Sequence, residues 1–210
     1  MKYTTINELN HFSFHDATIK AMTWFGKDLK WELYAVNATT DNTQNDFEKD
    51  MCIESAEVIF TDALIESIVF GGYKTYGSGG ILIEEVEAKT ALAEEHDNIL
   101  RDSLTNYCYI LSMDNYKQAE DGRYLADFNI DGGLGMLLAT LTFSGVTLSW
   151  EEFGGEAWYE HPKWKKSSSK PPRDTFTLQK RTSRFSSARG TSLPKRRTFR
   201  SPASSRQKKG

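Results

Sequence analysis

Alternating apolar and polar positions predict that most of this chain folds into short β-strands. Residues 17–36 have the pattern of two strands joined by a turn at 26–28. In the second of these strands Leu29, Trp31 and Leu33 alternate with charged or polar residues, which is the period of a strand with one buried face. We therefore expect an antiparallel pair here.

Three later segments repeat the plan of strand, turn and strand. The turns are expected near Thr61–Asp62, at Asp121–Gly122 and at Ser144–Gly145, where turn-forming residues separate apolar runs. The last is the clearest hairpin signal, because strict alternation continues on both sides of a tight Ser–Gly turn.

The remaining segments of the first 162 residues read as two loops and a helix. Residues 40–50 are expected to form a polar loop, and the Gly-rich residues 71–80 a flexible connector. Residues 87–106 are the best helix candidate, since their apolar side chains recur at helical spacing. The side expected to be buried comprises Ala88, Ala91, Leu92, Ile99, Leu100 and Ser103.

These elements predict an α+β fold that is predominantly antiparallel β. A curved meander sheet or a β-sandwich with one main helix fits the pattern, followed by a disordered C-terminal tail. A parallel α/β sheet does not fit, because the chain lacks the helices that parallel crossovers need.

The charge divides the chain at the same place as the pattern. Residues 1–162 contain 10 Lys or Arg against 28 Asp or Glu, a balance of −18. Residues 163–210 contain 16 Lys or Arg against one acid, a balance of +15. We expect a single acidic β-rich domain over 1–162 and a basic Ser/Pro/Arg-rich tail over 163–210, disordered from 167 onward because its apolar residues are too few to form a core.

The basic tail has three interpretations. It is an arm that binds nucleic acid through salt-sensitive phosphate contacts, a segment that folds back on the acidic domain, or the product of a shifted reading frame or a fusion. The loss of Ile, Asn and Tyr together with the gain of Arg, Pro and Ser beyond residue 163 favours the third, since a change in codon composition has that effect.

Targeting and redox features point to the cytoplasm. The N-terminus lacks the apolar region of a secretory signal, and no stretch approaches the ~18 apolar residues of a membrane span, so no membrane partner is expected. Cys52 and Cys108 lie in apolar, strand-like runs, and in a chain without export signals we expect free thiols that are not activated.

A histidine pair near the N-terminus offers the one candidate for metal chemistry. His11, His15 and Asp16 lie close together in sequence, and this set is the basis of an alternative hypothesis, a metal-dependent hydrolase. The catalytic Glu of an HExxH motif is missing and the segment leads directly into a strand. A local turn capped by Asp16 is the simpler interpretation, so we expect no bound metal, no cofactor and no catalytic set.

The most distinctive run interleaves aromatic and acidic residues over 150–160. Dense aromatic side chains are typical of cores and of binding hot spots, so the run either seals the end of the sheet or forms an acidic-aromatic binding surface. Its members are Trp150, Glu151, Glu152, Glu156, Trp158, Tyr159 and Glu160.

Two short motifs carry a resemblance to a known group of proteins. The stretches FHDATI (14–19) and WEEFGGEAWYE (150–160) resemble small uncharacterised proteins of Gram-positive bacteria, especially clostridia. Some relatives with an FHD-type motif are similar to immunity proteins of contact-dependent toxin systems. The resemblance covers roughly residues 6–162, and because its motifs have no known chemical role it implies little about mechanism. This chain departs from it by adding the basic tail.

The leading hypothesis is a non-catalytic binding protein whose acidic domain recognises a basic partner such as a toxin or nuclease. A charge of −18 attracts a basic protein at long range. The candidate binding residues are His15, Asp16, Trp150, Glu151, Glu152, Glu156, Trp158, Tyr159 and Glu160.

Overall fold

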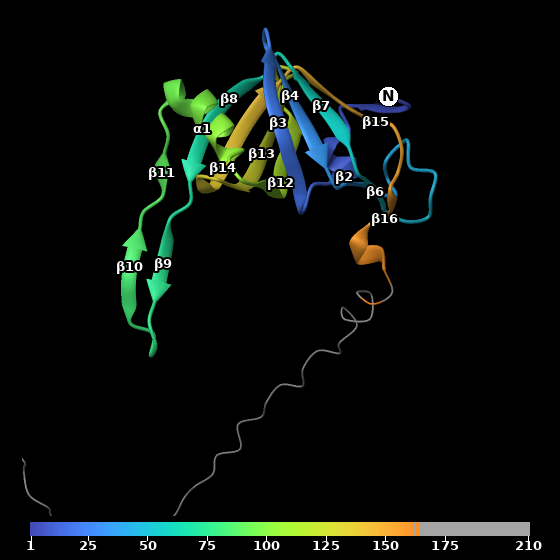
Figure 1. Ribbon diagram of the computed structural model, residues 1–210. Coiled ribbons are helices and arrows are strands. Elements are labelled where there is room, and N and C mark those ends of the chain that lie inside the picture. The colour runs from blue at the N-terminus through green and yellow to red at the C-terminus, as the bar shows by residue number, and fades with distance from the viewer. Residues whose placement is uncertain (162, 164–210) are drawn as a thin grey trace, which may run out of the picture. The chain divides into compact units, whose positions relative to one another are not determined.

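A computed structural model describes residues 1–161 and 163, so the predictions for the tail lie outside the described residues. The fold is built from antiparallel β-strands with one complete α-helix in this part of the chain, which confirms the predicted class (Figure 1). The largest sheet has the order β1 (Tyr3–Ile6), β15 (Gly145–Trp150), β7 (Ala56–Thr61), β4 (Asp28–Tyr34), β3 (Ala17–Phe25), β12 (Cys108–Gln118), β13 (Tyr124–Gly132), β14 (Gly135–Phe143), β8 (Leu64–Phe70) and β11 (Lys89–Thr90).

Two smaller sheets and four helical segments complete the described chain. A four-stranded sheet has the order β16 (Gly155–Glu156), β6 (Met51–Ile53), β5 (Val36–Ala38) and β2 (Phe12–Ser13), and a two-stranded sheet pairs β10 (Leu82–Val86) with β9 (Tyr73–Tyr76). The helix is α1 (His96–Ser103), and the 3-10 turns are η1 (Leu9–His11), η2 (Ala93–Glu95) and η3 (Trp158–Glu160).

Two of the predicted hairpins are wrong in their pairing. The turn at Gly26–Lys27 joins the paired strands β3 and β4, and the turn at Asp121–Gly122 joins β12 and β13, as expected. In contrast, β7 and β8 do not pair with each other, and neither do β14 and β15. The turns predicted at Thr61–Asp62 and Ser144–Gly145 are bends instead.

The two bends lie side by side in one long antiparallel ladder. On one side of the bend Gly145 pairs with Thr61, and on the other Thr142 pairs with Leu64. The amide of Ser144 donates to the carbonyl of Thr61 at 2.9 Å and holds the corner together. Strands that bend in this way pass from one part of a curved sheet to another, so the large sheet curls around its core.

Arg123 clamps the first bend. Asp62 has a left-handed backbone (φ 47°), a conformation that aspartate tolerates better than most residues. The Arg123 guanidinium donates to the Asp62 carboxylate and to its carbonyl oxygen, both at 2.7 Å. The hydrogen bond from Arg123 to the Asp62 carboxylate, together with that from Lys27, holds the pKa of the Asp62 carboxyl below its ordinary value.

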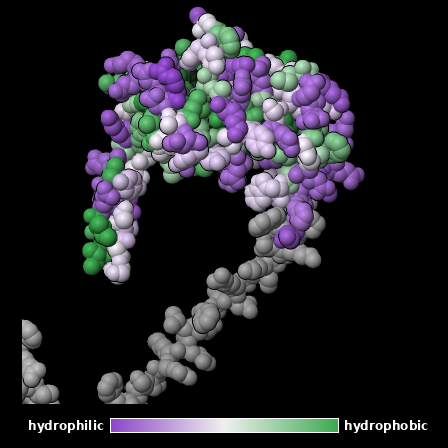
Figure 2. Space-filling model, in the orientation of Figure 1, coloured by the Kyte–Doolittle hydropathy of each residue, from purple (hydrophilic) through white to green (hydrophobic). Residues whose placement is uncertain are grey.

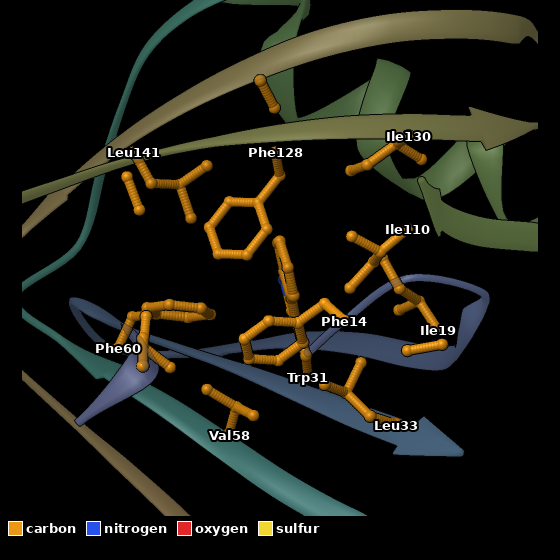
Figure 3. Close-up of a cluster of buried hydrophobic side chains, with 14 of the residues drawn as sticks. Phe14, Ile19, Trp31, Leu33, Val58, Phe60, Ile110, Phe128, Ile130 and Leu141 are labelled. Carbon is orange, nitrogen blue, oxygen red and sulfur yellow. The ribbon is translucent and has the colours of Figure 1, made fainter. Parts of the chain in front are cut away.

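The core lies inside the curled sheet and is rich in aromatic rings. Figure 3 shows side chains from β4, β7, β12 and β13 pointing toward one another. The Trp31 ring centroid lies 5.0 Å from Phe60 and 4.9 Å from Phe128, and Phe14 packs edge-on against Phe128 at 6.2 Å. The residues expected to alternate inward in β4, Leu29, Trp31 and Leu33, are all buried.

The helix is shorter than predicted. It covers His96–Ser103, whereas Lys89 and Thr90 pair with Phe70 and Val69 as strand β11. Backbone pairing with β8 therefore overrides the helical pattern at the start of the predicted segment. The helix ends against the turn between β13 and β14, where the Gly133 amide donates to the Ser103 carbonyl at 2.9 Å.

Candidate functional site

The two sequence motifs adjoin opposite edges of the same four-stranded sheet. The first motif begins directly after β2, which forms one edge, and continues into β3 of the large sheet; the second motif contains β16, which forms the other edge. The hydroxyl of Tyr159 connects them, since it donates to Asp50 Oδ2 at 2.8 Å and also contacts the Ser13 side chain. Burial and the nearby Asp50 carboxylate raise the pKa of Tyr159, so the hydroxyl remains a donor.

His15 and Asp16 form the turn between β2 and β3. Asp16 has a left-handed backbone (φ 66°), and His15 Nδ1 lies 2.8 Å from the carbonyl oxygen of Leu111 on β12. The Nε2 atom of His15 lies 3.5 Å from the Asp16 carboxylate, and both side chains are more than half exposed. The turn thus docks β2 onto β12 while leaving one carboxylate at the surface.

His11 and His15 each contact a different carboxylate. His11 Nδ1 lies 3.5 Å from the carboxylate of Glu8, the residue before η1, and His15 lies beside Asp16. Within residues 1–161 and 163, no group of three His, Cys, Asp or Glu side chains is arranged to hold a metal ion. The hydrolase hypothesis therefore finds no assembled ligand set in the described part of the chain.

Trp150 belongs to the core and not to the surface. Its side chain is fully buried, stacked 5.3 Å from Tyr3 and packed edge-on against Phe12 at 5.8 Å. Of the two interpretations of the 150–160 run, the sealing of the sheet applies to this residue. Trp150 therefore offers no surface to a partner.

The loop 40–50 packs against residues 151–160. The Lys49 ammonium lies 2.5 Å from the Glu156 carboxylate, and the Ala157 amide donates to the Asp50 carbonyl at 2.8 Å. The rings of Phe47 and Phe153 meet edge-on at 5.8 Å. These contacts follow from the pairing of β6, which comes directly after the loop, with β16.

Together the two segments form a surface that we call the acidic corner, defined as residues 41–50 and 151–160. Lys49 is its one basic residue. Phe47 and Trp158 expose about half of their surface (54% and 49%). The side of the molecule that carries the corner is largely hydrophilic in Figure 2. Its eight carboxylates belong to Asp41, Asp46, Glu48, Asp50, Glu151, Glu152, Glu156 and Glu160.

The sequence predicts one of the two segments of the acidic corner as a binding surface. Residues 151–160 are indicated by their density of aromatic residues, whereas residues 40–50 are predicted only as a polar loop. The four acids of the loop were a usable signal, but nothing local indicated that they face the second segment. That neighbourhood depends on the β6–β16 pairing, which joins positions about 100 residues apart.

Comparison with known proteins gives no further indication of function. No family model matches the chain, and searches of curated proteins and of solved structures found no match either. Among the residues that the structure covers, no helix has the length and apolar character needed to cross a membrane.

The two cysteines are free thiols, as predicted. Cys108 is buried, and burial raises its pKa from 9.0 to about 11, while burial also raises the pKa of the half-buried Cys52. The folded state therefore favours the protonated thiol of Cys108. Its contribution to stability is fully present below pH 9 and is lost as the pH rises toward 11.

We expect a thiol-specific reagent at pH 8 to label Cys52 in the folded protein and to leave Cys108 unmodified. The Cys108 thiol is buried and protonated at this pH, so it is neither accessible nor nucleophilic. In denaturant both should react. Mass spectrometry of peptides after timed labelling measures the two rates. Equal rates in the folded protein would contradict the burial of Cys108.

Proposed function

We propose that this chain is a non-catalytic binding protein of the immunity or inhibitor type, whose acidic corner recognises a basic protein. The observation that carries the proposal is the meeting of two acidic segments around two exposed aromatic rings, Phe47 and Trp158. Charge of one sign around apolar anchors is the arrangement by which a protein attracts and then holds a partner of opposite charge.

The charge balance supports a basic partner. Acids outnumber bases by 28 to 10 over residues 1–162, and half of these bases already contact a carboxylate of the same chain. Such an excess steers a basic protein toward the surface and raises its association rate. The bases with ion-pair contacts are Lys27, Lys30, Lys49, Lys74 and Arg123.

The aromatic rings supply the affinity that exposed charges cannot. An exposed ion pair contributes only about 0.2–1 kcal/mol, whereas a buried aromatic anchor at an interface contributes about 2 kcal/mol or more. Phe47 packs on Phe153, and Trp158 meets Tyr159 edge-on at 5.5 Å. Both rings are thus held in place before a partner arrives, which limits the entropy lost on binding.

The surface extends from the corner toward β2. Tyr159 contacts Ser13, and the turn that follows β2 presents the exposed Asp16 carboxylate beside His15. We propose that Asp16 lies at the rim of the interface and contributes to its long-range field. We also propose that the protein acts in the cytoplasm, where Cys52 and Cys108 stay reduced.

Matched charge variants test this proposal. In the variant with Glu48→Gln and Glu152→Gln, two exposed carboxylates of the acidic corner become neutral. In the control with Glu94→Gln and Glu120→Gln, two exposed carboxylates elsewhere become neutral, so the net charge is the same. Each protein is immobilised and used to capture partners from a lysate of the source cells, and the captured proteins are identified by mass spectrometry.

We expect a basic protein to be captured by the wild type and by the control, and its recovery to fall at least tenfold with the corner variant. Trp158→Ala should also reduce recovery at least tenfold, because it removes an anchor without changing the charge. Equal recovery with both charge variants would show that the overall charge, and not the acidic corner, is responsible.

A further inference from the structure

A two-stranded arm projects from the large sheet. Strands β9 and β10 continue from β8 and lead into β11, and they extend away from the curled sheet (Figure 1). At the base, a Cβ atom on Gly72 would lie 2.7 Å from both the Val86 carbonyl oxygen and the Ala88 nitrogen. The two chains of the arm therefore approach as closely as glycine allows. The segment predicted as a flexible connector contributes a defined strand, β9.

The arm exposes an unusual amount of apolar surface. The apolar residues at its tip are visible in Figure 2, and Ile81 and Ile83 are 70% and 69% exposed. An isolated two-stranded ribbon is at best marginally stable in water, and these side chains remain between 38% and 70% exposed. The exposed set is Tyr73, Tyr76, Ile81, Leu82, Ile83 and Val86.

The two outer edges of the arm differ. The β10 edge has a bulge between Leu82 and Glu84 and carries two adjacent glutamates, Glu84 and Glu85. Bulges and charges of one sign prevent a strand from pairing with its own copy. The β9 edge, Tyr73–Tyr76, has no acid and no bulge of its own. Within the described residues β9 pairs only with β10, so its other edge is open.

We propose that the β9 edge pairs with the same edge of a second copy of this chain, which gives a four-stranded antiparallel sheet and a dimer. A two-fold axis perpendicular to an antiparallel pair places one residue opposite itself. With the axis at Thr75, threonine faces threonine, and each Lys74 faces Tyr76 of the partner subunit. Thr–Thr pairs are favourable. The Lys74 ammonium ion-pairs with Glu85 of its own arm at 2.6 Å, and this register places it beside an aromatic ring of the second copy as well. An axis at Lys74 would instead place two ammonium groups face to face.

Pairing at the β9 edge brings the side chains of Tyr73 and Tyr76, which are 52% and 59% exposed, next to the partner strand. The residues of β10 lie one strand farther from the axis, so main-chain hydrogen bonds and these β9 side chains form the contact. Dimerisation by the arm is independent of the proposed function. The arm and the acidic corner lie on different sides of the sheet (Figure 1), so a dimer would present two acidic corners.

Two substitutions at one position test the pairing. Tyr76→Lys places like charges opposite each other in two pairs across the interface, whereas Tyr76→Glu places opposite charges there. Both lose the same contact with Leu82 within the arm, so damage to the hairpin is matched. Sedimentation equilibrium of the full chain between about 1 and 100 µM measures the dissociation constants.

We expect the wild type to dimerise, Tyr76→Lys to weaken the dimer at least tenfold, and Tyr76→Glu to stay within about threefold of the wild type. A wild type that stays monomeric throughout, or two variants that change the constant equally, would overturn the proposal.

Cysteine cross-linking locates the axis. In the proposed register, Thr75→Cys brings two sulfur-bearing residues to a Cα separation of about 4.5–5.5 Å, within reach of a disulfide. Lys74→Cys leaves its two copies about 8 Å apart, too far to bridge. Mild oxidation should therefore yield a reducible dimer with the first variant only, and equal cross-linking of both would contradict the register. Capture of a basic protein is scored separately, so either proposal can fail alone.

Discussion

Replacing Trp31 with alanine is expected to lower the free energy of unfolding by about 3–5 kcal/mol, as for other large core side chains. Trp31 is fully buried on β4 and packs against Phe60 of β7 and Phe128 of β13, which also contact each other at 5.9 Å. Its removal leaves a cavity beside this cluster of rings. Urea denaturation followed by circular dichroism measures the loss, with the m-value checked for two-state behaviour.

Trp31→Phe is the matched control. The indole Nε1 of Trp31 is buried without a hydrogen-bond partner among the described residues, and phenylalanine removes this polar atom while keeping an aromatic ring. The relief of a buried, unpaired N–H offsets part of the lost volume, so we expect a cost below about 1.5 kcal/mol. A cost equal to that of alanine would contradict a central role for ring packing.

Replacing Gly133 with alanine is expected to cost about 3 kcal/mol, because the new side chain has no space. Gly133 lies in the turn between β13 and β14, against the end of α1. A Cβ atom there would lie 2.4 Å from the Thr105 carbonyl oxygen and 3.0 Å from the Thr105 Cβ. The helix end must move, and its hydrogen bond from the Gly133 amide is strained or lost.

Gly71→Ala serves as the control for the general effect of a glycine substitution. A Cβ on Gly71 meets no atom within 4 Å, so its stability should change by less than about 1 kcal/mol. Chemical denaturation of both variants gives the comparison. A loss of stability of similar size in both would show that the contact between α1 and the β13–β14 turn is not tight.

The strands could be predicted from the sequence, but their pairing could not. The alternation of Val146, Leu148 and Trp150 is the same whether β15 folds back on β14 or continues past a bend. What decides between the two is the register of β15 with β7, a partner about 90 residues away. Local turn residues such as Ser144 allow both geometries, and in the structure β15 pairs with β7 instead of β14.

The arm and the helix illustrate the same limit. Residues 87–92 have helical spacing, yet Lys89 and Thr90 pair with β8 because that strand offers an open edge. The glycines of 71–80 suggested a connector, whereas Gly79 and Gly80 supply the positive φ values of the turn at the arm's tip. Composition indicated the turn residues correctly but gave no means of recognising the strands on either side.

Only part of the candidate site could be predicted from the sequence. The carboxylates and rings of residues 151–160 could be identified, because acidic and aromatic residues are concentrated in this short segment. It assigned Trp150 to the same surface, although every second residue of a strand faces inward and Trp150 is the last inward residue of β15. The contribution of residues 41–50 depends on contacts between distant segments, which no local pattern contains.

The most direct test of the acidic corner as a binding surface is the capture experiment with the matched charge variants, run in parallel on a chain that ends at residue 166. All the buried hydrophobic residues of the described chain precede residue 162, so this shorter chain retains them. The account predicts that the full and shortened chains capture the same basic protein, that moderate salt releases it, and that the Glu48→Gln, Glu152→Gln variant loses it. Capture of nucleic acid by the full chain alone, with no basic protein bound to either, would contradict it.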